Sequence, residues 1–381
     1  MKKIIIAPDS FKGSLTAAEV ANAIEEGIKK VLPKCETVKI PIADGGEGTM
    51  DTMVSAMGGK KVKVEVNDPL MRPIEVEYGL VTVGKTAIIE MATASGITLL
   101  SKEEQNPLVT STHGTGEIIK DALLRGCQSF LIGIGGSATN DAGTGMLKAL
   151  GYRFLDRNGK ETDGTGKSLH SICSIDESGA MPEVKEAHFI IACDVNNPFC
   201  GPYGAAYVYA PQKGANEQMI EELDEGMEKF RKLIEKEKTI DLNTIQGAGA
   251  AGGLGGGFVA FLNAQLKPGI EMVLDAVGFA KHLQNADLVI TGEGKLDEQT
   301  GMGKAASGIL DAASKKDVPV IAIGGSVEDV VNLNKRGFLS VFSITPYPMS
   351  LEKAMQKETT RRNIIQITEQ IMRTIKHIQN K

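Results

Sequence analysis

Short apolar segments that alternate with helix-like segments occur at both ends of the chain, and they constrain its fold most strongly. Residues 2–8 form the first apolar run, and residues 16–19 read as a capping box that opens a helix. Further buried-strand segments at 288–290, 318–323 and 339–344 alternate with helical segments. Buried strands alternating with helices are typical of a parallel sheet covered on both faces, so we expect both ends of the chain to share one doubly wound sheet.

The middle of the chain has a different pattern. Between residues 61 and 91 apolar and polar residues alternate with period two, and turn residues interrupt the alternation, which predicts an antiparallel meander. Strands are expected at 188–193 and near 205–209, and an amphipathic helix at about 217–236. We therefore predict an α/β protein with a discontinuous doubly wound domain, an inserted mixed α/β domain, and the active site in the cleft between them.

The expected domain boundaries follow from these patterns. The first domain is assigned residues 1–62, 283–381 and 106–150, and the inserted domain is assigned residues 63–105 and 151–282.

Composition excludes several classes of protein. The 381 residues are 42% hydrophobic and 24% charged, as in globular proteins. The net charge of −6 comes without a basic cluster, which argues against a nucleic-acid surface. No apolar stretch is long enough for a membrane span, and the first ten residues lack the features of a signal peptide. The five cysteines form no CxxC pair, so we expect no disulfides. Together these features predict a cytoplasmic protein without nucleic-acid partners or membrane contact, and a homo-oligomer stays open.

Four glycine-dense loops lie at 41–49, 133–141, 247–257 and 291–297. Glycine lets a ligand approach the backbone closely, and successive N–H groups can bind anionic oxygens. All of these loops except 247–257, which we interpret as a hinge or packing segment, carry acids or hydroxyls. The acids are Asp44, Glu47, Asp141, Glu293 and Asp297. Acids and glycines together predict a site for phosphate and a divalent metal.

Two segments match nucleotide-binding motifs. Residues 79–86 fit the P-loop expression, but an apolar strand follows instead of a helix, so we reject that reading. Residues 133–138 fit the dinucleotide fingerprint in a strand–loop–helix context, and Asp156 lies near the end of the next strand. A nicotinamide-dependent hydroxyacid dehydrogenase is therefore an alternative function, and a nucleotide-binding module without turnover is a second one. The loop could also be a plain glycine turn that packs over a helix and binds no ligand.

Segments in the same order from residue 3 to about 326 closely resemble bacterial type I glycerate kinases. Among them are APDSFKGSL, PIADGGEGT, GIGGSATNDAGTGML and DLVITGEGKLD. The resemblance implies ATP-dependent phosphorylation of D-glycerate with Mg²⁺. It also implies a flavodoxin-like domain carrying an inserted domain likened to restriction endonucleases. We favour 2-phosphoglycerate as the product, with 3-phosphoglycerate as the alternative. Met71 departs from the family pattern, which has Gly before Arg72.

Roles can be assigned because phosphoryl transfer needs cations for the phosphates, a metal bridge, and a base for the attacking hydroxyl. Asp194 is expected to be the base, with turn capping as its alternative, and Lys12 and Lys213 the catalytic cations. Arg72 is expected to bind the glycerate carboxylate, together with Ser10. The expected metal ligands are Asp44, Glu47, Asp141 and Glu293, and the expected nucleotide or phosphate contacts are Gly45, Gly46, Gly135, Gly136, Ser137, Thr139, Asn140 and Gly292.

Overall fold

The computed structural model describes residues 1–43, 48–297 and 305–379. The chain divides into two compact units. Residues 1–44 and 273–381 make one, which we call the terminal unit, and residues 45–272 make the other, the central unit. Each unit is described by itself.

The terminal unit contains a five-stranded parallel sheet with the order β13-β12-β11-β1-β2. Its strands are β1 (Lys3–Ile6), β2 (Glu36–Lys39), β11 (Leu288–Leu296), β12 (Val320–Val327) and β13 (Ser340–Ser343). Strand β1 lies between β2 and β11, and the chain continues from β1 to one edge of the sheet and from β11 to the other. This is a topological switch point, where doubly wound sheets bind ligands at the carboxyl ends of their strands.

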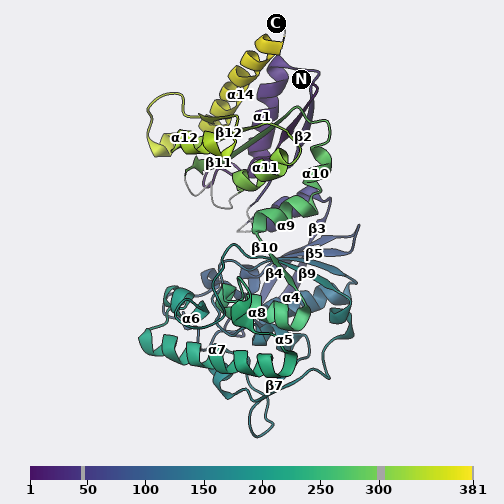
Figure 1. The fold of residues 1–381 in the computed structure, drawn as a ribbon, viewed down its shortest axis with the longest axis vertical. Helices are drawn as coiled ribbons and strands as arrows, with labels where there is room; N and C mark the ends of the chain where they lie inside the picture. Colours follow the sequence, from purple (N-terminus) through teal and green to yellow (C-terminus); the bar gives the residue numbers. More distant parts are fainter. Residues whose placement is uncertain (44–47, 298–304, 380–381) are drawn as a thin grey trace. The chain divides into compact units, whose positions relative to one another are not determined.

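The helices of the terminal unit connect these strands. They are α1 (Ala17–Val31), α10 (Phe279–His282), α11 (Ala305–Ser314), α12 (Val330–Arg336), α13 (Leu351–Ala354) and α14 (Lys357–Gln379). The predicted capping box is confirmed at the start of α1, where Thr16 and Glu19 bond reciprocally. Helices α1 and α14 lie side by side (Figure 1), so close that a Cβ at Gly27 would lie 2.7 Å from Cβ of Thr368.

The central unit contains a six-stranded mixed sheet with the order β10-β9-β6-β5-β4-β3. Its strands are β3 (Lys60–Asn67), β4 (Pro73–Val81), β5 (Thr86–Glu90), β6 (Ser129–Gly133), β9 (His188–Ala192) and β10 (Gln265–Lys267). Strands β5, β6, β9 and β10 are parallel, whereas β3, β4 and β5 pair antiparallel. A separate antiparallel ribbon joins β7 (Arg153–Leu155) and β8 (Ser174–Asp176).

The helices of the central unit pack around this sheet. They are α2 (Thr49–Ala56), α3 (Ala92–Ser95), α4 (His113–Leu124), α5 (Thr144–Ala149), α6 (Ala205–Tyr209), α7 (Glu217–Lys238) and α8 (Ala250–Leu262). Helix α9 (Gly269–Ala276) crosses the division between the two units. None of the helices in the described part of the chain combines the length and apolar character that a membrane crossing requires.

Several expectations from the sequence are confirmed. The protein is α/β with a parallel sheet built from both ends of the chain, and residues 61–91 form the antiparallel meander. The P-loop match at 79–86 is the end of β4 and the turn into β5, and no helix follows it. The predicted helix at 217–236 is α7.

Other expectations differ from the structure. Residues 106–150 were assigned to the terminal sheet, but β6 pairs with β5 and β9 in the central unit, because an apolar strand pattern reports burial and not the pairing partner. The central unit also begins earlier and ends earlier than expected, at residues 45 and 272. The strand expected near 205–209 is helix α6, since a five-residue apolar run fits either structure. The loop expected at 291–297 is strand for most of its length, because β11 pairs with β12 as far as Leu296.

Candidate functional site

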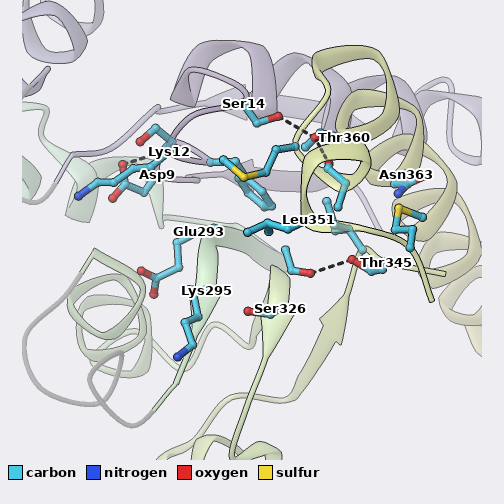
Figure 2. Close-up of a pocket in the computed structure, with 18 residues that line it drawn as sticks. Asp9, Lys12, Ser14, Glu293, Lys295, Ser326, Thr345, Leu351, Thr360 and Asn363 are labelled. Atoms are coloured by element: carbon cyan, nitrogen blue, oxygen red, sulfur yellow. Dashed lines mark hydrogen bonds between the residues drawn. The ribbon is translucent and has the colours of Figure 1, made fainter. Parts of the chain in front are cut away.

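A cavity of about 510 Å³ opens at the switch point of the terminal unit. Asp9, Ser10 and Lys12 come from the loop that follows β1, and Glu293 and Lys295 come from β11 (Figure 2). These residues lie at the carboxyl ends of the two strands where the sheet connections diverge. Ligands bind at this position in open parallel sheets.

Backbone hydrogen bonds hold the charged end of the cavity in place. The N–H of Asp9 donates to the carbonyl of Gly292 at 2.8 Å, which ties the loop after β1 to β11. The N–H of Ser10 donates to Oδ1 of Asp9 at 2.5 Å. Glu293 and Lys295 are two residues apart on a strand and therefore share one face. The ammonium of Lys295 is balanced by Asp297 at 3.3 Å and by Glu328 at 3.1 Å.

The opposite end of the cavity is less charged. Leu351 and Met355 line it from the region of α13, and Thr360 and Asn363 line it from α14. Figure 2 shows Asp9, Lys12, Glu293 and Lys295 gathered on one side, with Thr360 and Asn363 on the other. The cavity thus has a charged end and an end of apolar and neutral polar side chains.

In the central unit, the glycine loop after β6 presents its backbone outward. Gly136 has a left-handed φ of 74°, Gly135 does not, and both are exposed. Within the described part of the chain, no group accepts a hydrogen bond from the N–H of Gly135, Gly136 or Ser137. A Cβ built at Gly135 meets no atom within 4 Å. Successive N–H groups without a protein acceptor beside a left-handed glycine resemble an anion-binding nest, so we name residues 135–137 the nest.

A buried lysine supports the nest from below. Lys213 ends a short 3₁₀ helix and is only 2% exposed. Its Nζ donates to Oγ of Ser137 at 2.7 Å and to the carbonyl of Thr139 at 2.6 Å. Burial lowers the pKa of this ammonium to about 7, and the nearby Asp141 carboxylate opposes the shift. Because Oγ of Ser137 accepts from the lysine, its own proton is available to a ligand.

Asp141 is fully buried inside the same loop. Its Oδ2 accepts from the N–H and the hydroxyl of Thr112, at 2.8 and 2.7 Å, and from the N–H of Gly145 at 3.2 Å. Its Oδ1 accepts from the N–H of Gly143 at 3.1 Å. Burial raises the pKa of this carboxyl, and these hydrogen bonds oppose the rise. With both oxygens engaged by protein donors, the geometry favours a structural role over the expected metal contact.

The remaining polar residues of the loop face the interior. Thr139 and Asn140 are fully buried, and Nδ2 of Asn140 contacts Sδ of Met227 at 3.1 Å. The glycine-rich segment 247–257 packs against them, because a Cβ at Gly252 would lie 2.1 Å from the carbonyl of Thr139. The packing role expected for 247–257 is therefore confirmed. The structure places Gly135, Gly136 and Ser137 at the nest, with Thr139 and Asn140 beneath it.

Arg72 lies in the turn between β3 and β4, and two carboxylates fix its orientation. Its Nε donates to Oδ2 of Asp68 at 2.6 Å, and its Nη1 donates to Oε1 of Glu104 at 2.6 Å. The guanidinium is about half exposed. A Cβ at Gly214 would lie 2.1 Å from the carbonyl of Gln105, so the segment carrying Glu104 contacts the segment carrying Lys213. The structure thus brings the surroundings of Arg72 and Lys213 together.

Two other expected site residues have structural contacts. Asp194 follows β9 and is exposed, and its Oδ1 accepts from the N–H of Gly269 at 2.9 Å at the start of α9. This contact agrees with the alternative role of Asp194 as a capping residue. The role of Asp194 as a base stays a prediction. Gly292 lies within β11, where a Cβ would come within 2.5 Å of the carbonyl of Ile323, so strand packing explains this glycine. Outside the described residues lie Asp44, Gly45, Gly46 and Glu47.

Two of the four expected magnesium ligands, Asp44 and Glu47, lie outside the described residues. No group of three or more acidic, histidine or cysteine side chains with metal-site geometry occurs within residues 1–43, 48–297 and 305–379. Magnesium in phosphate-transferring enzymes is commonly held by one or two carboxylates together with substrate phosphates. Asp9 and Glu293 both line the charged end of the cavity and fit that smaller requirement.

Several residues that line this cavity were not expected from the sequence, among them Asp9, Thr360 and Asn363. Asp9 follows a buried strand as Glu293 follows the apolar start of β11, so the same argument would have found it. Thr360 and Asn363 lie on the final helix, which we interpreted only as a packing element. The sequence pattern that could have indicated them is a pair of polar residues three positions apart, which lie on the same face of the helix next to the buried isoleucines.

Comparison with known proteins gives a consistent result. The model of the glycerate kinase family matches residues 4–376. The glycerate kinase of Halalkalibacterium halodurans is 48% identical over 370 residues, which covers 96% of this chain and 97% of that protein. The glycerate 2-kinase of Escherichia coli is 45% identical over 355 residues and covers 93% of both. A crystal structure of glycerate kinase 2 from Salmonella typhimurium LT2 is similar to this chain with a TM-score of 0.91 and 43% identity, and the match covers 100% of both chains.

Proposed function

The chain belongs to the glycerate kinase family and is a kinase, and from this premise we propose that it transfers the terminal phosphoryl group of ATP to the 2-hydroxyl of D-glycerate with Mg²⁺. The name of the Escherichia coli relative, glycerate 2-kinase, supports the 2-hydroxyl over the 3-hydroxyl. The cytoplasmic location stays a prediction from the sequence, and a homo-oligomer stays open.

The nest and the buried lysine beneath it carry this proposal. Both reactants of the proposed reaction are anions, and phosphoryl transfer depends mainly on positioning and on stabilising negative charge. The nest offers three N–H groups and the hydroxyl of Ser137, with the ammonium of Lys213 2.7 Å from that hydroxyl. A charge held in a low-dielectric site interacts more strongly with a bound anion than a surface charge does.

Other residues supply the remaining parts of the reaction. We assign the carboxylate of glycerate to Arg72, whose orientation is fixed by Asp68 and Glu104, because a guanidinium can bind a carboxylate through two parallel hydrogen bonds. Lys12, at the charged end of the cavity, is assigned to phosphate oxygens. Ser10, which the sequence assigned to glycerate together with Arg72, lines the same charged end, and we reassign it to phosphate for that reason. Asp194 is assigned as the base that receives the proton of the attacking hydroxyl.

Asp9 and Glu293 are the described residues that would hold Mg²⁺. When bound, the cation would neutralise charge on the phosphates. The two carboxylates also repel unaccompanied phosphate, so they favour a nucleotide that arrives with its metal.

The structure argues against the dehydrogenase alternative, because Asp156 is not placed to bind the ribose of a dinucleotide. It required Asp156 to lie at the end of the strand that follows the glycine loop within the same sheet. Strand β7, which precedes Asp156, instead pairs with β8 in the separate ribbon. Oδ1 of Asp156 accepts from the N–H groups of Asn158 and Lys160, at 2.8 and 2.9 Å, which makes it a turn residue.

A coupled assay of ADP formation tests the proposed function. We expect ADP to form only when both D-glycerate and Mg²⁺ are present, and we expect chelation of the metal to abolish it. The control replaces ATP with NAD⁺ or NADP⁺ and follows the absorbance of the reduced cofactor. Formation of ADP that does not depend on glycerate, or reduction of the nicotinamide cofactor by glycerate, would contradict the proposal.

A further inference from the structure

The less charged end of the terminal-unit cavity has no role in the chemistry described so far. We infer that this end binds the adenine base of the nucleotide and that the side-chain amide of Asn363 hydrogen-bonds the edge of the base. The inference rests on the proposed use of ATP. It also moves the nucleoside to the terminal unit, whereas the sequence placed most nucleotide contacts on loops of the central unit.

The size of the cavity fits a nucleotide better than it fits glycerate. Pockets for ligands of drug or cofactor size have volumes of about 300–1,000 Å³, and the cavity measures about 510 Å³. Glycerate has only three carbons and carries a carboxylate and two hydroxyls, so it has no surface that would need an apolar wall. A purine base does have such a surface.

Two exposed apolar side chains form part of the wall. Leu351 is 75% exposed and Met355 is 37% exposed, although both line the cavity. Phe11, from the loop after β1, also lines the cavity but is only 3% exposed, because it packs in the core of the terminal unit. Apolar groups left exposed together in a concave site mark a binding surface, and a flat aromatic base would cover them.

Asn363 provides the polar group that distinguishes a base from a purely apolar ligand. It lines the cavity and is only 3% exposed, and its side-chain amide has no hydrogen-bond partner within the described part of the chain. The amide is not among the sealed polar atoms without a partner, so it faces the cavity, and a ligand that hydrogen-bonds it there replaces water with a fixed partner. An asparagine amide offers one donor and one acceptor side by side, which match the neighbouring acceptor and donor on an adenine edge.

The two threonine hydroxyls nearest this end of the cavity already have protein partners. The hydroxyl of Thr360 donates to the carbonyl of Ala354 at 2.8 Å and shares a hydrogen bond of 2.7 Å with Oγ of Ser14. The hydroxyl of Thr345 donates to the carbonyl of Gly325 at 2.9 Å. These contacts also fix the walls against which the base would pack.

The arrangement gives the bound nucleotide one orientation. Figure 2 places Asn363 on the side of the cavity away from Lys12, Glu293 and Lys295. With the base at Asn363, the phosphates extend toward the charged end, where Lys12 and the proposed metal ligands lie. The reverse orientation would bury phosphate charge against Leu351 and Met355, which is unfavourable.

The test measures nucleotide binding separately from turnover. Titration calorimetry with ADP and with adenosine is performed on the full-length protein and on two variants, Asn363→Leu and Leu351→Asp. We expect each variant to weaken ADP and adenosine binding about tenfold or more, because one loses a paired hydrogen-bonding group and the other places a charge against the base. The KM for ATP should rise by the same factor, and the KM for D-glycerate should stay unchanged.

The matched control is Val331→Asp, which also places an acid at an exposed apolar residue of the terminal unit. Val331 is 63% exposed on α12 and does not line the cavity. We expect this variant to bind ADP as the unmodified protein does. Thermal melting of each variant checks that it is folded, and Leu351→Asp, a surface change, keeps the test valid if Asn363→Leu does not fold.

The outcomes separate this inference from the proposed function. If ADP is formed from ATP and glycerate but neither Asn363→Leu nor Leu351→Asp alters ADP binding, the adenine site lies elsewhere and the inference is overturned. A rise in the KM for glycerate without a change in ADP binding would also overturn it, because the cavity would then hold the acceptor. If no ADP forms from ATP with any acceptor, the proposed function itself fails, while adenosine binding would still report on the cavity.

Discussion

Lys213 is a buried cation whose hydrogen bonds connect it to the nest. Replacing it with Met keeps the length of the side chain and removes the charge and both hydrogen bonds. We expect kcat/KM for D-glycerate to fall by about 100-fold or more, the scale on which removal of one preorganised charge-stabilising donor acts. We expect the protein to stay folded, because an apolar side chain suits a buried position.

The control for Lys213→Met is Lys148→Met in the same unit. Lys148 is partly buried, whereas Lys213 is fully buried, and Lys148 pairs with Glu161 at 3.2 Å, in the region of the β7–β8 ribbon. We expect this variant to retain kcat/KM within about threefold. Equal losses in both variants would mean that Lys213 only supports the fold.

The lowered pKa of Lys213 predicts a pH dependence. Burial lowers the pKa to about 7 from an ordinary 10.5, so above about pH 7 the folded protein loses the ammonium charge while the unfolded chain still carries it. The unfolded chain therefore binds more protons between these two values, and stability should rise with pH across that window. Binding of an anion at the nest should weaken as the pH rises through 7, because the ammonium charge that attracts the anion is then lost. The KM for glycerate measured from about pH 6 to about pH 9 checks this, and the dependence should be absent in Lys213→Met.

Met71 is predicted to be a strained residue. Its φ is 63°, in the left-handed region that favours glycine. We expect Met71→Gly to raise stability by about 1 kcal/mol through relief of this strain, which thermal melting would detect. Met71→Ala serves as the control, because it shortens the exposed side chain and keeps the strain; a gain in Met71→Ala equal to that in Met71→Gly would contradict the account.

At the scale of elements, the glycine-rich helix α8 shapes the loop that carries the nest. Gly252 combines a φ of 71° with a site where a Cβ would lie 2.1 Å from the carbonyl of Thr139. We expect Gly252→Ala to destabilise the protein by about 2–4 kcal/mol and to lower kcat/KM, because the loop must move away. Thermal melting and steady-state kinetics measure the two effects.

Gly159→Ala is the control for this change. Gly159 has a similar φ of 74°, and a Cβ there meets no atom within 4 Å, so the variant introduces backbone strain alone. We expect a loss of about 1 kcal/mol and unchanged kinetics. If both variants lost the same stability, the close packing of α8 would not be what holds the loop.

The elements also show what the sequence could predict. The first strand, the capping box of α1, the antiparallel meander and α7 follow from local periodicity and end signals, and the structure has all of them. The sequence did not predict the sheet to which β6 belongs. Strand β6 pairs with β5 and β9, and this long-range pairing cannot be read from the strand itself because several strands of the chain are similarly apolar. Helix α6 was read as a strand because its five residues are too few to distinguish the two periods.

The site was predictable to a similar extent. Glycines and acids after strands led to the loop at 133–141 and to the carboxyl end of the sheet that holds β11. Which of their side chains face outward did not follow from the sequence. The nest exposes Gly135 and Gly136 and buries Asp141, and this depends on the contact with α8 more than 100 residues away in the chain. Asn363 was missed because one polar residue on a packed helix has no distinctive local pattern.

For the whole molecule, the two units divide the proposed chemistry. The terminal unit provides a cavity with a charged end at a sheet switch point, and the central unit provides the nest, Lys213 and Arg72. The family membership of the full chain is consistent with this division, since the match extends from residue 4 to residue 376 and so includes both units.

The most direct test of the central claim is phosphorus NMR of the products formed from ATP, Mg²⁺ and D-glycerate. The account predicts equal amounts of ADP and 2-phosphoglycerate, with Lys213→Met forming the same product far more slowly. Phosphate on the 3-hydroxyl would contradict the proposed position of transfer. Free phosphate without a phosphorylated acceptor, or no consumption of ATP, would contradict the claim that this chain transfers phosphate from ATP to glycerate.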